Sequence, residues 1–208
     1  MKSFRICMQN IRKWGSNSRI KMCLIMSFLF VYSYISGMWK IIPLVGEKMN
    51  PWIFPFLFCW RFMKIVFMAP IVFIFCDAPF IDSNQSYVML RTSRKKWCFG
   101  QVLYIYAGSV IYAFVLFFST IIINIGHIKW GTSWGKVLGS AGTSTVLSTL
   151  GINYTTVKVP TIVIRYYTPA QAMFFSFLLM VLSFIFIGLL IYTVNVITKT
   201  NVAGTIIA

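Results

Sequence analysis

Four long apolar stretches, separated by polar and basic segments, dominate the pattern of the chain. They lie at about residues 20–39, 52–76, 101–124 and 170–194. The hydrocarbon core of a bilayer is about 30 Å thick and takes about 20 apolar residues in a helix, which each stretch supplies. The pattern therefore predicts an all-α fold, a polytopic integral membrane helix bundle with four complete transmembrane helices over 20–208.

A polar and basic segment, residues 1–19, precedes the first apolar stretch. It is too polar to span a membrane, but a helical arrangement gathers its apolar residues on one face and its lysines and arginines on the other. The apolar positions are Phe4, Cys7, Met8, Ile11 and Trp14. A basic amphipathic helix of this kind lies in the headgroup region of a bilayer. Residues 1–19 are therefore predicted to form an interfacial helix on anionic lipid headgroups.

The last seven residues, Val202–Ala208, are mostly apolar again. This length is too short to cross a bilayer. Two interpretations stay open at this point. The segment is either the start of an incomplete fifth span or a short hydrophobic tail folded onto the bundle.

Two cations, Arg61 and Lys64, interrupt the second apolar stretch. If one helix covers 52–76, both lie near its middle, at a cost of about 2.5–3.5 kcal/mol each on insertion scales. One interpretation is that both side chains snorkel outward to the headgroups. The other is that the pair, at positions i and i+3, faces a polar cavity that handles anionic groups.

Lysine and arginine are distributed unequally between the connectors. With the N-terminus inside, eleven of the 19 lie on the inner side and six on the outer side. Since cytoplasmic loops carry the excess of Lys and Arg, both termini and the connector 77–97 are predicted to be cytoplasmic. The connector 125–168 is then extracytoplasmic, and the chain is a multi-pass protein of the cell membrane.

Composition strengthens the membrane prediction and explains the charge. Hydrophobic residues make up 59% of the chain and charged residues 11%, against about 25% charged in soluble domains. The net charge of +16 is attributed to anionic lipid on the cytoplasmic face, and no nucleic acid partner is expected. The five cysteines include no CxxC pair, so free thiols without a disulfide framework are expected.

The scarcity of acids excludes several kinds of chemistry. The acidic residues are Glu47, Asp77 and Asp82, and the single histidine is His127. Paired-carboxylate chemistry, proton relays through a bilayer and metal sites with oxygen or nitrogen ligands need several such groups close together. We therefore expect no enzyme activity, no catalytic residue, no metal site and no cofactor.

The order of these parts resembles the N-terminal portion of an ABC-2-type permease, the membrane subunit of an ABC exporter. The basic helix at Met1–Trp14 is followed by two spans and then by a short basic segment at about Asn84–Trp97. In the family this last position holds a cytoplasmic coupling helix that docks on the ATPase. The resemblance implies that an ATPase-coupling surface is formed by Arg91, Arg94, Lys95, Lys96 and Trp97.

The layout also departs from the family. Such permeases usually have six spans and a short link between the third and fourth, whereas this chain has four apolar stretches and the connector 125–168. A truncated permease, a small accessory subunit and a different family of similar topology all fit this arrangement.

Two functions follow as alternatives. The resemblance implies a permease subunit that forms a homo- or heterodimer and works with a separate ABC ATPase chain. The second alternative is a non-transporting membrane scaffold, sensor or immunity-type protein, in which the basic connector 77–97 is a simple positive-inside anchor.

Overall fold

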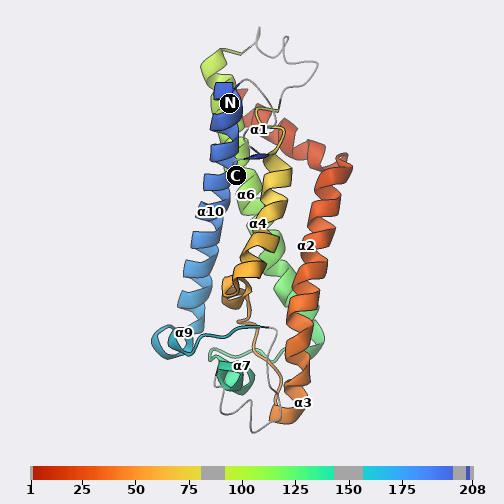
Figure 1. Ribbon diagram of the computed structural model, residues 1–208, viewed down its shortest axis with the longest axis vertical. Helices are drawn as coiled ribbons and strands as arrows, with labels where there is room; N and C mark the ends of the chain where they lie inside the picture. The colour runs from red at the N-terminus through yellow and green to blue at the C-terminus, as the bar shows by residue number, and fades with distance from the viewer. Residues whose placement is uncertain (1, 81–91, 143–156, 199–204, 207–208) are drawn as a thin grey trace. The chain divides into compact units, whose positions relative to one another are not determined.

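The structure of the chain is a computed structural model that describes residues 2–80, 92–142, 157–198 and 205–206. Within these ranges the regular elements are helices, and no β-strand is among them. The all-α prediction is therefore confirmed for the described part of the chain. Figure 1 shows these helices in chain order.

The chain divides into two compact units. The first unit consists of Met1–Ile25, Met68–Ala113 and Val181–Ala208, and the second consists of Met26–Phe67 and Phe114–Met180. Each unit buries its own set of large apolar side chains, such as Tyr112 in the first and Phe56 in the second.

Three helical segments are long and apolar enough to cross a membrane, namely Ser18–Val45, Arg94–His127 and Pro169–Thr198. They correspond to three of the four predicted spans. Their parts are α2 (Ser18–Ser36), η2 (Gly37–Lys40), α3 (Ile42–Val45), α6 (Arg94–Asn124), η4 (Ile125–His127) and α10 (Pro169–Thr198).

The second apolar stretch differs from the single helix predicted over 52–76. It is divided into a 3₁₀ helix, η3 (Phe54–Phe58), and α4 (Arg61–Phe75). With 15 residues, α4 is about 22 Å long, which is short of a bilayer core. A fourth complete span is therefore not present among the described helices. Residues 53–57 are all buried, so this part of the stretch packs inside the second unit and not against lipid.

The core of the first unit is centred on the ring of Tyr104 in α6. Phe75, the last residue of α4, packs edge-on against it with ring centroids 5.9 Å apart, and Phe80 does so at 4.7 Å. Asn195 of α10 is buried and donates from Nδ2 to the carbonyl oxygen of Ala78 at 2.7 Å. A side chain of α10 thus supplies a hydrogen bond to the backbone carbonyl of Ala78, just after α4, as a buried carbonyl oxygen requires.

The second unit ties residues 49–52 to the chain that follows α6. Met49 pairs with Ile128 in an isolated parallel bridge, with hydrogen bonds of 3.0 Å to the carbonyl oxygen of His127 and 2.9 Å from the amide of Lys129. Trp52 Nε1 donates to the carbonyl oxygen of Gly131 at 2.8 Å. These contacts join segments about 80 residues apart in sequence.

The described part of the predicted connector 125–168 is also folded. It contains α7 (Gly135–Gly142) and α9 (Thr161–Tyr166). Trp134 is buried; its indole packs on Phe56 with ring centroids 5.4 Å apart and donates to the carbonyl oxygen of Tyr167 at 3.0 Å. The part of the connector at residues 143–156 lies outside the described residues.

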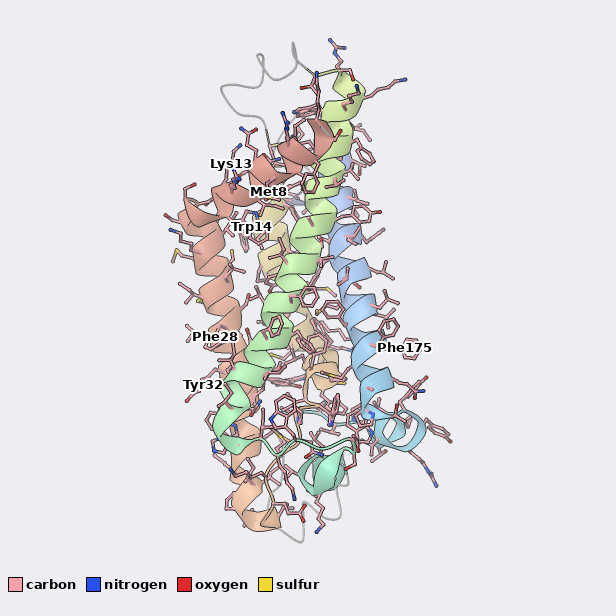
Figure 2. The ribbon with its side chains drawn as sticks, turned by 180° about the vertical axis from the view of Figure 1, so that it is seen from behind. Met8, Lys13, Trp14, Phe28, Tyr32 and Phe175 are labelled. Carbon is pink, nitrogen blue, oxygen red and sulfur yellow. The ribbon has the colours of Figure 1, made fainter. Side chains whose placement is uncertain are left out.

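Large apolar side chains also point outward from the long helices. Figure 2 shows Phe28 and Tyr32 on the outer side of α2 and Phe175 on the outer side of α10. Their exposed fractions are 37%, 47% and 49%. Exposed aromatic side chains on long apolar helices suit a lipid environment.

Gly188 of α10 provides a test of packing in the first unit. A Cβ atom at this position would lie 2.6 Å from Ile105 Cγ2 and 2.9 Å from Phe75 Cδ2, and both of these side chains are fully buried. Gly188→Ala should therefore lower the free energy of unfolding by about 1–3 kcal/mol, as overpacking does. Gly139→Ala is the matched control, because a Cβ atom there has open space in α7. Thermal unfolding in detergent measures both variants, and equal midpoints would contradict this packing.

Candidate functional site

The predicted coupling residues lie at the start of α6. The side chains of Arg94, Lys95 and Lys96 are exposed, and Trp97 is half-buried. Arg91 lies outside the described residues. Because α6 runs without interruption from Arg94 to Asn124, these cations belong to the same helix as the third predicted span. The structure thus places them on one 31-residue helix.

The first turn of the N-terminal helix α1 (Lys2–Arg12) is attached to the first turn of α6. Ser3 Oγ donates to the carbonyl oxygen of Lys96 at 2.8 Å. Gly100 lies where the two helices meet, since a Cβ atom there would be 3.0 Å from Ile6 Cβ and 3.1 Å from the carbonyl oxygen of Ser3. Figures 1 and 2 show α1 lying across the N-terminal part of α6. A larger residue at position 100 would push the helices apart.

Two further hydrogen bonds continue the attachment along α1 and the 3₁₀ turn η1 (Lys13–Gly15) that follows it. Asn10 Nδ2 donates to Gln101 Oε1 at 3.0 Å, and both side chains are buried. Trp14 Nε1 donates to the Tyr104 hydroxyl at 2.7 Å. The two partners on α6 lie within one turn of each other, so the contacts fix the rotation of α6 as well as its position.

The apolar face predicted for residues 1–19 is divided in the structure. Cys7 and Trp14 are buried, whereas Phe4 is 58% exposed and Met8 is 38% exposed. The sequence prediction missed Asn10, which is polar but buried with its partner Gln101. Its position four residues before Trp14 is the one signal in the sequence that places it on the same face. Met8 and Trp14 are labelled in Figure 2.

The α1–α6 joint presents a cluster of exposed cations, which we call the basic end. It is defined by Lys2, Arg5, Arg94, Lys95 and Lys96. The hydrogen bond between Ser3 and Lys96 brings the first turns of the two helices together, so cations from two segments of the chain share one surface. Such a surface attracts anionic lipid headgroups or an acidic protein surface.

An ion pair in the same unit joins the start of α2 to the residues that follow α4. The guanidinium of Arg19, in the first turn of α2, donates to both carboxylate oxygens of Asp77, with Nη1 and Oδ1 3.2 Å apart. This hydrogen-bonded pair holds the pKa of Asp77 below its usual value, although partial burial acts in the opposite direction. The pair connects the beginning of α2 to the short segment that follows α4.

A second ion pair lies in the other unit. Lys136 Nζ of α7 donates to Glu47 Oε1 at 2.7 Å. This hydrogen bond holds the pKa of the Glu47 carboxyl below its usual value. Both side chains are exposed, so the pair orients α7 more than it stabilises the fold.

The second set of predicted site residues, Arg61 and Lys64, lies in the first turn of α4, and both side chains are exposed. An apolar pocket of about 340 Å³ is present in the same unit, but neither cation lines it. Its lining residues are Trp52, Phe114, Phe117, Ala170, Met173, Phe174 and Phe177. The polar cavity and the snorkelling interpretation both stay predictions.

Metal binding has no candidate in the residues that the structure describes. No group of three or more His, Cys, Asp or Glu side chains in these ranges is placed to hold a metal ion. His127 instead stacks on Trp39, with ring centroids 4.8 Å apart. Trp39 Nε1 also donates to Asn124 Oδ1 at 3.1 Å, which gives these side chains a structural role.

Comparison with known proteins gave no relative. No protein-family model matches the sequence, no curated protein matches it, and no solved structure matches the fold.

The Asn10–Gln101 hydrogen bond predicts how the stabilities of a single and a double variant differ. Asn10→Leu removes one partner and leaves the buried Gln101 amide unsatisfied, so the free energy of unfolding should fall by about 1–3 kcal/mol. Replacing both residues with leucine should recover most of this loss, because no unpaired polar group remains. Thermal unfolding in detergent, together with trypsin cleavage after Arg12, measures the effect. A double variant less stable than Asn10→Leu would contradict it.

The Arg19–Asp77 pair predicts a pH dependence. Because the pKa of Asp77 is lowered in the folded protein, the pair contributes stability above the ordinary carboxyl pKa of about 3.9. That contribution is lost as the pH falls through the lowered pKa. Asp77→Asn should therefore be less stable than the wild type at pH 7, by up to about 1 kcal/mol for this half-exposed pair. A difference that persists undiminished at pH 2 would show that charge is not the cause.

Proposed function

We propose that the chain is the membrane-spanning permease subunit of an ABC-type exporter that works with a separate ATPase chain. The observation that carries this proposal is the α1–α6 joint. There, a basic surface is attached by hydrogen bonds from Ser3, Asn10 and Trp14 to a helix long and apolar enough to cross a membrane. The proposal includes a cell membrane location with both termini cytoplasmic, and assembly as a homo- or heterodimer.

The mechanical argument rests on the continuity of α6. At about 1.5 Å per residue, its 31 residues extend for about 46 Å. Because Arg94, Lys95 and Lys96 belong to this helix, no flexible connector separates the docking surface from the predicted span. A push on these residues by an ATPase that closes on ATP would tilt or shift the whole helix, which is the shear motion common in transport and switching proteins.

The attachment of α1 to α6 means that the two helices move together. Asn10 and Trp14 are hydrogen-bonded to α6, so α1 must move with it. Phe4 and Met8 are exposed beside exposed cations such as Arg5, and this combination suits the headgroup region of an anionic membrane. In the proposed function, α1 keeps the start of α6 at the membrane surface while the ATPase acts on it.

The test is retention of an ABC ATPase by the full chain. The protein is purified in mild detergent from the cells in which it occurs naturally. The bound ATPase is then measured by mass spectrometry and by ATP hydrolysis. The variant Arg94→Glu/Lys95→Glu/Lys96→Glu should retain about tenfold less ATPase than the wild type, since it reverses the charges at the docking surface.

A matched control separates docking from net charge. Lys40, Lys48 and Lys129 are exposed cations of the second unit, and changing all three to glutamate alters the net charge by the same amount. This variant should retain the ATPase as the wild type does. If the wild-type chain retains no ATPase, the exporter proposal is wrong and the non-transporting scaffold, sensor or immunity-type alternative is favoured. Equal loss in both triple variants would show that the basic end is not the docking surface.

A further inference from the structure

We propose that Arg61, Lys64 and Lys158 of the second unit together bind the phosphate of an anionic phospholipid, with Trp60 at the centre of the site. This inference goes beyond the proposed function, because it concerns a different surface and needs no ATPase. It requires only that the chain lies in a membrane.

The geometry begins with the first turn of α4. The backbone amide of Lys64 donates to the carbonyl oxygen of Trp60 at 3.1 Å, so residues 60–64 form one helical turn. At about 100° per residue, Lys64 projects between Trp60 and Arg61 when viewed along the axis. The two cations and the indole therefore share one side of the helix.

The third cation comes from a distant part of the chain. Lys158 Nζ lies 5.9 Å from the centroid of the Trp60 ring, which is a cation–π distance. Lys158 is exposed, while its neighbours Val157 and Val159 are buried. The two valines hold this segment against the core and leave the lysine at the surface beside Trp60.

The charge of this cluster has no acidic partner within its own unit. Of the three acidic residues, only Glu47 belongs to the second unit, and its carboxylate accepts from Lys136. No acidic residue of this unit is therefore left to neutralise Arg61, Lys64 and Lys158. An anion that bridges them would remove their mutual repulsion and form charge-assisted hydrogen bonds with each.

The surroundings favour an amphiphile over a soluble anion. Trp60 is 40% exposed, Phe62 is 56% exposed and Ile65 is 68% exposed. Cations mixed with exposed aromatic and aliphatic side chains match a molecule that carries a phosphate and acyl chains. A soluble anion would gain nothing from the apolar residues, and an acyl chain alone would gain nothing from the cations.

The experiment measures lipid binding by the full chain in detergent. Native mass spectrometry follows titration with dioleoyl phosphatidylglycerol, dioleoyl phosphatidylcholine and inorganic phosphate, each used separately. The wild type should bind the anionic lipid about tenfold more tightly than the zwitterionic one. The variant Arg61→Gln/Lys64→Gln/Lys158→Gln should reduce this preference to about twofold, and the preference that remains is that of the basic end.

The matched control is Lys40→Gln/Lys48→Gln/Lys129→Gln, which removes the same charge from exposed cations elsewhere in the second unit and should keep the preference. If the site triple variant does not fold, Lys158→Gln alone serves, with an expected loss of about threefold. An unchanged preference in a folded site variant would overturn the proposal, and so would an equal loss in the control. Inorganic phosphate that binds as tightly as the anionic lipid would show a soluble-anion site and also overturn it.

Discussion

The hydrogen bond from the Trp14 indole to the Tyr104 hydroxyl is the contact on which the first unit depends. A phenol among apolar side chains needs a polar partner, and here the partner comes from the N-terminal segment. The ring of the same tyrosine packs edge-on against Phe75 and Phe80. One side chain therefore joins the N-terminal segment, α6 and the end of α4, and Gly188 brings α10 against Phe75.

The long helices could be predicted from the sequence because an unbroken apolar run of about 20 residues matches the thickness of a bilayer core. The division of residues 52–76 could not be predicted in the same way. Hydropathy is the same for a residue facing lipid and one facing a protein core, so it could not show that residues 53–57 are enclosed on all sides. Pro55 fits the start of a long helix, but it suits the short 3₁₀ turn η3, where the structure places it, equally well.

The candidate sites show a similar limit. Runs of charge such as Arg94–Lys96 are visible in the sequence, but they were expected on the connector before the third span, whereas the structure places these exposed cations at the start of α6 itself. What the sequence could not provide are partners far along the chain, such as Gln101 for Asn10 and Lys158 for Trp60. Neither pair has a local spacing rule, because each depends on how two distant segments meet. With three acidic residues in the chain, few ion pairs could form, but the sequence could not show which lysine or arginine pairs with each acid.

The attachment of α1 has a consequence for biosynthesis. Ser3, Asn10 and Trp14 find their partners 93, 91 and 90 residues later in the chain. At a synthesis rate of about 5–20 residues per second, α1 exists for roughly 5–20 s before its docking surface has been made. During that interval the Asn10 amide and the Trp14 indole have no partner on α6. Helix α1 therefore cannot reach its final place before residues 96–104 have been made, and a nascent chain stalled before residue 96 would leave it unattached.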